Sequence, residues 1–134
     1  MREPMAKQPI SEGLKSFVKE EIQTVLKLEV LLLLHNQQPR SFTAAEVANE
    51  LGFENEETQY QLTALEAIGV LVESTADKPK YRYHPLNAKL RSLVDQLAVS
   101  YSEQRVPILS IILADHSDRT RLFAQAFRII RKTD

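Results

Sequence analysis

The chain has 134 residues, of which 43% are hydrophobic and 26% are charged, so it is long enough for one globular domain with a real core and too short for two. It contains no cysteine, which excludes disulfide frameworks, thiol catalysis and thiolate metal sites and is compatible with a reducing cytosol. The 17 Lys and Arg residues nearly balance the 18 Asp and Glu residues, leaving a net charge of −1. Total charge therefore indicates no particular partner.

The sequence contains no pattern of a membrane span or of a secretory signal. Its most apolar run, Val30 to Leu34, is far shorter than the roughly 18 residues that a span requires. The first ten residues include Pro4 and Pro9 and lack the apolar stretch of a signal, so we expect residues 1–10 to form a flexible leader. The expected location is the cytoplasm, with no membrane partner.

The first predicted helix is long and changes character along its length. Ser11 can cap it, and apolar residues recur at spacings of three and four as far as Leu26. From Leu28 to Leu34 nearly every face is apolar, so we expect this half to be covered on more than one side, by the domain core and by a second subunit. Pro39 ends the helix.

A short strand and a capped helix are predicted next. Ser41 and Phe42 have room for only a single short edge strand. Thr43 and Glu46 form the pattern T-x-x-E, in which each side chain satisfies a backbone N–H at the start of a helix. We expect this helix to end at Gly52.

A second helix and a hairpin follow. The helix runs from about residue 55 to Ile68, and Gly69 suits a left-handed C-cap. The segments 70–74 and 80–84 are rich in β-branched and aromatic residues, which predicts two strands joined by a five-residue turn.

Two or three helices are predicted in the C-terminal part. The apolar spacing from Leu86 to Tyr101 predicts a helix of about five turns. Pro107 is expected to interrupt it and to restart it over residues 108–113. Ser117 or Asp118 can cap a last helix, which turns these cations outward: Arg119, Arg121, Arg128, Arg131 and Lys132.

This order of elements resembles the winged helix-turn-helix domain of bacterial transcriptional regulators. The resemblance covers roughly residues 22–84, and its most specific parts are T-A-A-E-V-A-N-E-L-G and L-x-x-L-x-x-x-G-V-L-V. The first is similar to the first helix of the motif, and the second to the recognition helix where it enters the wing. The resemblance implies a mainly α fold with a small β-hairpin. A winged domain with a long first helix (11–85) would be followed by a C-terminal helical segment for dimerisation (86–134).

Charge is distributed unevenly along the sequence. Residues 41–77 hold eight acidic residues and no Lys or Arg, whereas residues 1–40 carry +1 and residues 78–134 carry +6. In DNA-binding members of such families, the second helix of the motif lies in the major groove and basic residues contact the flanking phosphates. The groove-facing positions implied here include two glutamates and no cation: Glu56, Glu57, Gln59, Tyr60 and Thr63.

The first functional hypothesis is a dimeric DNA-binding transcriptional regulator. Affinity for double-stranded DNA comes largely from neutralised phosphates, so cations outside the recognition helix are expected to carry it. The candidate contacts are Gln59, Tyr60 and Thr63 on the helix, the C-terminal arginines, and the wing cations, by which we mean Lys78, Lys80 and Arg82. A second explanation of the wing cations is that charge keeps an exposed strand from pairing with other chains.

The second hypothesis keeps the fold and changes the partner. Glu54, Glu56 and Glu57 repel phosphate and would suit a basic protein partner, which makes the protein a winged-helix interaction module with little or no DNA affinity. A structural explanation also exists, because anions in the first turn of a helix complement its dipole by a few tenths of a kcal/mol each.

No pattern in the sequence predicts an enzyme. His35, His84 and His116 have no ligand spacing between them, and the three glycines form no phosphate-binding loop. We therefore predict no catalytic residue, metal ligand or cofactor. The apolar surface of residues 86–113 exceeds what one small winged domain needs, which predicts a homodimer formed through the first helix and the C-terminal segments.

Overall fold

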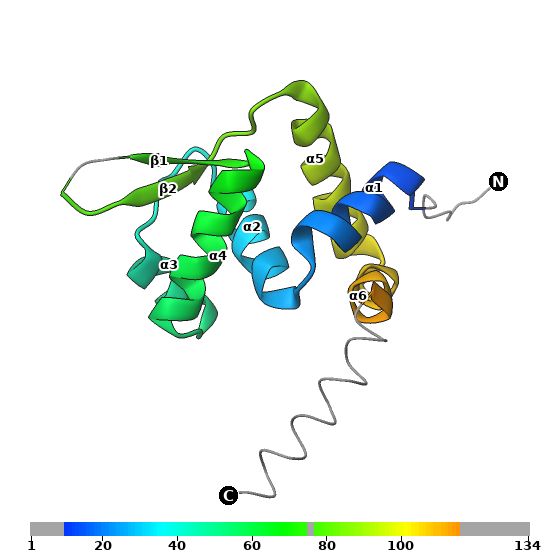
Figure 1. The fold of residues 1–134 in the computed structure, drawn as a ribbon, viewed down its shortest axis with the longest axis horizontal. Coiled ribbons are helices and arrows are strands. Elements are labelled where there is room, and N and C mark those ends of the chain that lie inside the picture. Colours follow the sequence, from blue (N-terminus) through cyan, green and yellow to red (C-terminus); the bar gives the residue numbers. More distant parts are fainter. Residues whose placement is uncertain (1–9, 75–76, 116–134) are drawn as a thin grey trace, which may run out of the picture.

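The computed structural model describes residues 10–74 and 77–115 (Figure 1). The predicted leader up to residue 9 and the predicted last helix with its arginines lie outside the described residues. Within them, no helix has the length and the apolar composition of a membrane span. The elements are α1 (Glu12–Phe17), the π-helix η2 (Val18–Ile22), α2 (Val25–Asn36), α3 (Ala44–Leu51), α4 (Asn55–Ile68), β1 (Leu71–Ser74), β2 (Lys80–Tyr83), α5 (Ala88–Glu103) and α6 (Arg105–Asp115).

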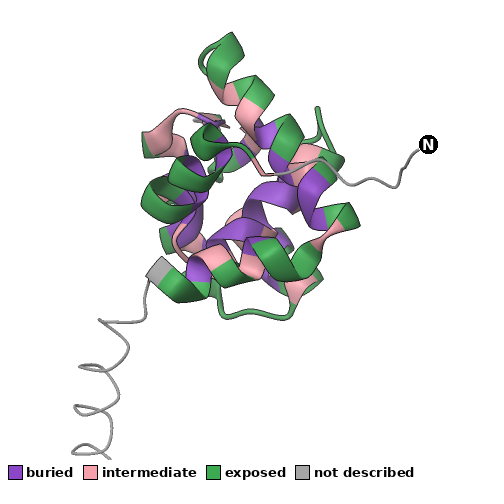
Figure 2. Ribbon diagram, turned by 90° about the vertical axis from the view of Figure 1, so that its right-hand side faces the viewer, coloured by how far each residue is buried: buried purple, intermediate pink, exposed green. Residues whose placement is uncertain are grey.

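Helix α2 forms the centre of the core. Its residues Leu28, Val30, Leu31 and Leu34 have no exposed surface. The helix contacts η2, α3, α4 and β2, and Figure 1 shows it between the hairpin side of the molecule and the side of α1, α5 and α6. Buried residues lie on the inner sides of the helices throughout (Figure 2). The expected covering of this helix on more than one side is confirmed for elements of the same chain, and its covering by a second subunit stays a prediction.

The first helix is not continuous, which corrects the prediction of one long helix. Ser11 caps α1 as expected, since its Oγ accepts the N–H of Leu14 at 3.1 Å. The helix then stops at Gln23, whose φ is 73°. Thr24 begins α2, because its Oγ1 accepts the N–H of Lys27 at 3.1 Å. When Thr24 caps a new helix, the helix before it cannot continue through this position. The spacing of apolar residues does not show this, because it is the same for one helix and for two.

A buried lysine stabilises the chain at this break between η2 and α2. Lys27 is only 8% exposed, and its Nζ donates a hydrogen bond to the backbone carbonyl of Glu21 at 2.9 Å. The lysine thereby satisfies one of the carbonyls that the end of η2 leaves open. Burial lowers the pKa of Lys27, and the charge of Glu21 opposes that shift.

The helix-turn-helix begins and ends on the predicted signals. Thr43 and Glu46 form the capping box, with the N–H of Glu46 donating to Thr43 Oγ1 at 3.1 Å and the N–H of Thr43 donating to Glu46 Oε1 at 2.9 Å. Gly52 and Gly69 end α3 and α4 with φ values of 77° and 103°. At Gly69 a Cβ would also lie 3.3 Å from the Cβ of Leu86, so two constraints favour glycine there.

The hairpin and its edge strand also match the prediction. Strands β1 and β2 are antiparallel, and the register places Leu71 opposite Tyr83 and Ser74 opposite Lys80. Phe42 pairs with Tyr81 in a single bridge, with N–O distances of 2.8 and 2.7 Å. This bridge joins the start of the helix-turn-helix to the wing.

The C-terminal helices differ from the prediction in one respect. The chain breaks at Gln104, between α5 and α6, and not at Pro107. Pro107 is the third residue of α6. A proline in the first turn of a helix removes an N–H that has no partner within the helix, so it is tolerated there.

We expect Leu31→Ala to lower the free energy of unfolding by about 2–5 kcal/mol, because it leaves a cavity on the central helix. Val25→Ala on the same helix is the matched control. Val25 is 39% exposed, so its truncation should cost no more than about 0.5 kcal/mol. Urea unfolding measures both, and equal losses would contradict this description of the core.

The capping box gives a prediction for pH. The hydrogen bond from the backbone N–H of Thr43 lowers the pKa of Glu46. The ionised carboxylate therefore adds stability above the pKa it has in the unfolded chain, about 4.3, and the contribution is lost as the pH falls through the folded pKa. Glu46→Gln should be less stable than the natural chain near neutral pH, and the difference should narrow as the pH falls below the unfolded pKa of about 4.3. Urea unfolding near neutral pH and again in acid measures this, and a difference that stayed the same would contradict it.

Candidate nucleic-acid interface

Helix α4 presents to solvent what we call the α4 stripe, formed by Glu56, Glu57, Tyr60 and Thr63. These four side chains are exposed, and Tyr60 is exposed by 69%. Spacings of three and four residues place them on one face, opposite the buried Leu62 and Leu65. The stripe is acidic near the start of the helix and neutral further along. Glu54 lies just before the helix and is exposed as well.

Gln59 lies differently from the other predicted contact residues of this helix. It is half-buried, and its Nε2 donates hydrogen bonds to Tyr81 Oη at 2.8 Å and to Thr63 Oγ1 at 3.2 Å. Tyr81 belongs to β2, so this amide lies between the recognition helix and the wing. Of the three predicted helix contacts, Tyr60 and Thr63 are exposed, and the Thr63 hydroxyl already accepts the hydrogen bond from Gln59.

The wing cations lie on the outer side of the hairpin. Lys80 is exposed and Arg82 half-exposed, whereas Tyr81 and Tyr83 between and after them are buried, as expected for alternating residues of a strand. Lys78 is exposed in the turn. The ion pairs among the described residues join Lys15 to Glu12 and His35 to Asp95, and they leave all three wing cations unpaired. Arg82 still contacts His84 Nδ1 at 3.3 Å, and the charge of Lys80 acts on Glu46.

Arg40 is a further cation on this side of the molecule, and no pattern in the sequence predicted it there. Its guanidinium lies 4.3 Å from the centre of the Phe42 ring. The pKa of Glu46 is lowered first by the Thr43 backbone and then by the charges of Lys80 and Arg40, so both cations lie near that carboxylate. Arg40 lies far from the wing in the sequence. The pairing of Phe42 with Tyr81 brings it close to the wing in the fold.

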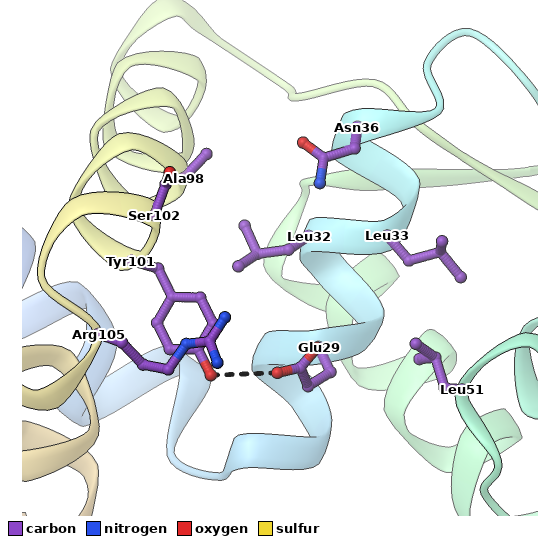
Figure 3. Close-up of a pocket in the computed structure, with 9 residues that line it drawn as sticks. All are labelled: Glu29, Leu32, Leu33, Asn36, Leu51, Ala98, Tyr101, Ser102 and Arg105. Carbon is purple, nitrogen blue, oxygen red and sulfur yellow. Dashed lines mark hydrogen bonds between the residues drawn. The ribbon is translucent and has the colours of Figure 1, made fainter.

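A cleft between α2 and the C-terminal helices is a second candidate site (Figure 3). Tyr101 Oη donates a hydrogen bond to Glu29 Oε2 at 3.1 Å, and the guanidinium of Arg105 lies 4.8 Å from the centre of the Tyr101 ring. Burial raises the pKa of Tyr101, and the charge of Glu29 adds to the shift. The lining combines these polar groups with apolar side chains: Glu29, Leu32, Leu33, Asn36, Leu51, Ala98, Tyr101, Ser102 and Arg105.

The cleft has the composition of a site for a small organic molecule. Such sites join an apolar wall to a few polar groups that orient the ligand. Here Arg105 offers donors for an anionic group, while Glu29 is already bonded to Tyr101. The lining residues come from four helices, so no local pattern in the sequence could have identified them.

The described histidines serve structural contacts. His35 Nε2 lies 3.0 Å from Asp95 Oδ1, and the His35 ring meets Tyr83 edge-on with the ring centres 5.0 Å apart. His84 Nδ1 lies 3.3 Å from a guanidinium nitrogen of Arg82. Within residues 10–74 and 77–115, no three His, Asp or Glu residues converge in a group that would hold a metal ion.

Neither a protein-family model nor a curated protein matches the sequence. Solved structures do match it. MepR, a transcription regulator of the Staphylococcus aureus multidrug efflux pump MepA, is 14% identical with a TM-score of 0.52, over 93% of each chain. Bordetella bronchiseptica BpsR, whose DNA binding is regulated by 6-hydroxynicotinic acid, is 17% identical with a TM-score of 0.51, over 87% of each chain.

A Methanosarcina mazei Go1 protein described as a possible transcriptional regulator is 16% identical with a TM-score of 0.51, over 82% of this chain and 94% of its own. At such identities the likeness concerns the fold. The chain has the winged helix-turn-helix fold of these transcription regulators, with α3 and α4 as the helix-turn-helix and β1–β2 as the wing.

Proposed function

We propose that the protein is a dimeric DNA-binding transcriptional regulator in which the wing supplies much of the contact with the DNA backbone. The observation that carries the proposal is the set of three unpaired wing cations on the outer side of the hairpin, beside a helix-turn-helix. Neutralising phosphates is the main source of affinity for a duplex. No described carboxylate forms an ion pair with the wing cations, so their charges can serve this purpose. Arg40 extends the same basic side of the molecule.

The recognition helix would then contribute sequence preference more than affinity. The α4 stripe has no cation and cannot release counterions from the DNA. Its glutamates can accept hydrogen bonds from the amino group of cytosine, and Thr63 can contact a base by its hydroxyl or its methyl group. Wing and helix thus have separate tasks in this proposal.

Regulation would act through the cleft between α2 and α5. BpsR shows that DNA binding by a protein of this fold can respond to a small aromatic acid. In this chain the cleft joins the central helix of the winged unit to Tyr101 and Arg105 of the C-terminal helices. A ligand in this cleft would contact both the winged unit and the C-terminal helices.

The dimer is proposed from exposed apolar side chains of α5 and α6. Val99, Val106 and Leu113 are exposed by 54%, 71% and 66%. A contiguous patch of exposed apolar side chains is typical of an association surface, and we propose that these three form one. We propose a homodimer that covers these residues and pairs two winged units.

One observation favours the interaction-module hypothesis as a second candidate. Tyr60 lines a shallow hollow together with Glu54, Glu56 and Glu57. An exposed aromatic ring among carboxylates suits a Lys or Arg side chain of a basic protein partner. This candidate predicts negligible DNA affinity, so one binding measurement separates the two.

We expect the natural chain to bind duplex DNA at low salt, with affinity falling steeply as salt rises. Lys80→Glu combined with Arg82→Glu should abolish this binding. Glu56→Ala should not weaken binding to a mixture of sequences, because it removes a repulsive charge and a base contact by Glu56 would matter only at particular sequences. Fluorescence anisotropy with a pool of genomic fragments measures all three. Absence of binding by the natural chain at low salt would reject the regulator and favour the interaction module.

For the dimer, sedimentation at tens of micromolar should show two copies of the natural chain. Val106→Glu should shift the population to monomer, because it places a charge in the proposed apolar interface. Tyr60→Glu is the matched control, since Tyr60 is similarly exposed, at 69%, but lies on α4. A monomeric natural chain at these concentrations would contradict the proposal.

A further inference from the structure

The amide of Gln59 links the recognition helix to the wing. Its two donated hydrogen bonds end on Thr63 of the same helix and on the hydroxyl of Tyr81 in β2. Among the described residues, the bond from Gln59 to Tyr81 is the one side-chain hydrogen bond between α4 and β2. Tyr81 itself is held firmly, because its ring is buried and its backbone is bonded to Phe42 in both directions.

These bonds leave Gln59 poorly suited to reading a base. A glutamine that recognises adenine donates from its amide nitrogen and accepts at its oxygen. Here both amide hydrogens have acceptors inside the protein, at 2.8 and 3.2 Å. A base contact would require breaking at least one of these bonds, and the Tyr81 hydroxyl, with its ring 3% exposed, would lose its partner.

The link lies where helix and wing must act together. Gln59 precedes the exposed Tyr60 of the α4 stripe, and Tyr81 stands between the wing cations Lys80 and Arg82. A protein that contacts DNA through both elements needs their separation to match the distance between a groove and its flanking phosphates. The hydrogen bond from Gln59 to Tyr81, at 2.8 Å, ties the two elements together between these contact residues.

We propose that Gln59 is a positioning residue, which holds the wing against the recognition helix through Tyr81 and does not itself contact DNA bases. The proposal rests on the proposed DNA-binding function for its consequence, while the link itself can be tested without DNA. Tyr81→Phe is the sharpest change, because it removes one hydroxyl and keeps the buried ring.

The chain also offers a matched control. Tyr83 lies two residues away in the same strand, is equally buried, and its hydroxyl has no hydrogen-bond partner among the described residues. Tyr83→Phe therefore removes the same group from the same strand without breaking a bond. Any effect of Tyr81→Phe that Tyr83→Phe does not share belongs to the link with Gln59.

The first experiment measures the link without DNA. Because the chain has no cysteine, Asn55→Cys and Asp77→Cys place spin labels on α4 and on the wing turn alone. We expect Tyr81→Phe and Gln59→Leu to broaden the distribution of distances between the labels, and Tyr83→Phe to leave it unchanged. An unchanged distribution in Tyr81→Phe would overturn the inference, whether or not the protein binds DNA.

The second experiment measures binding to a DNA fragment selected with the natural chain. Tyr81→Phe should lower the affinity by roughly threefold to tenfold, about what the loss of one hydrogen bond supports. Gln59→Leu should lower it equally, and the double variant no further, because both break the same link. The salt dependence and the preferred base at each position should stay the same, since no phosphate or base contact is lost.

The opposite pattern would overturn the inference. If Gln59 reads a base, Gln59→Leu should weaken binding and relax the preference at one position, while Tyr81→Phe leaves binding unchanged. If the natural chain binds no DNA at all, the proposed function fails, and the label distances alone decide whether the link exists.

Discussion

The structure depends on the need to cover the apolar residues of α2. Leu28, Val30, Leu31 and Leu34 are fully buried and point to more than one side of the helix, so no single neighbour can bury them all. The helix-turn-helix and β2 pack on it from one direction, and η2 continues the covering from another. Residues beyond the hairpin join the same buried cluster, among them Leu97 and Ile108. The winged unit and the C-terminal helices consequently share one core.

Helix ends that depend on a few neighbouring residues could be predicted from the sequence. Helix breaks could not, because the same residues can either continue one helix or cap the next. Thr43 and Glu46 satisfy each other's backbone within one turn, and Gly69 meets a backbone requirement at its own position, so both helix ends were foreseeable. The breaks at Gln23 and Gln104 were not, because apolar spacing continues across them. Thr24 could have revealed the first break, since a threonine inside a predicted helix is also a good cap.

The candidate site follows the same division. The exposure of the wing cations follows from alternation along one strand, and a sequence can show that. The place of Arg40 and the partner of Gln59 depend on the pairing of Phe42 with Tyr81, residues that are far apart in the chain. The cleft of Glu29, Tyr101 and Arg105 is lined by residues of α2, α3, α5 and α6, so it depends on how these four helices are arranged. Such long-range packing has no signature in the local sequence.

The acidic start of α4 affects how strongly the proposed regulator would bind DNA that is not its target. A chromosome offers about 10⁶–10⁹ wrong sites for every right one, and attraction to the wrong sites is almost wholly a matter of phosphate charge. Glu56 and Glu57 stand on the exposed face of the helix with no cation beside them on that face. In the proposed regulator this helix would add nothing to the attraction of bulk DNA. More copies would therefore remain free to find an operator than with a basic recognition helix.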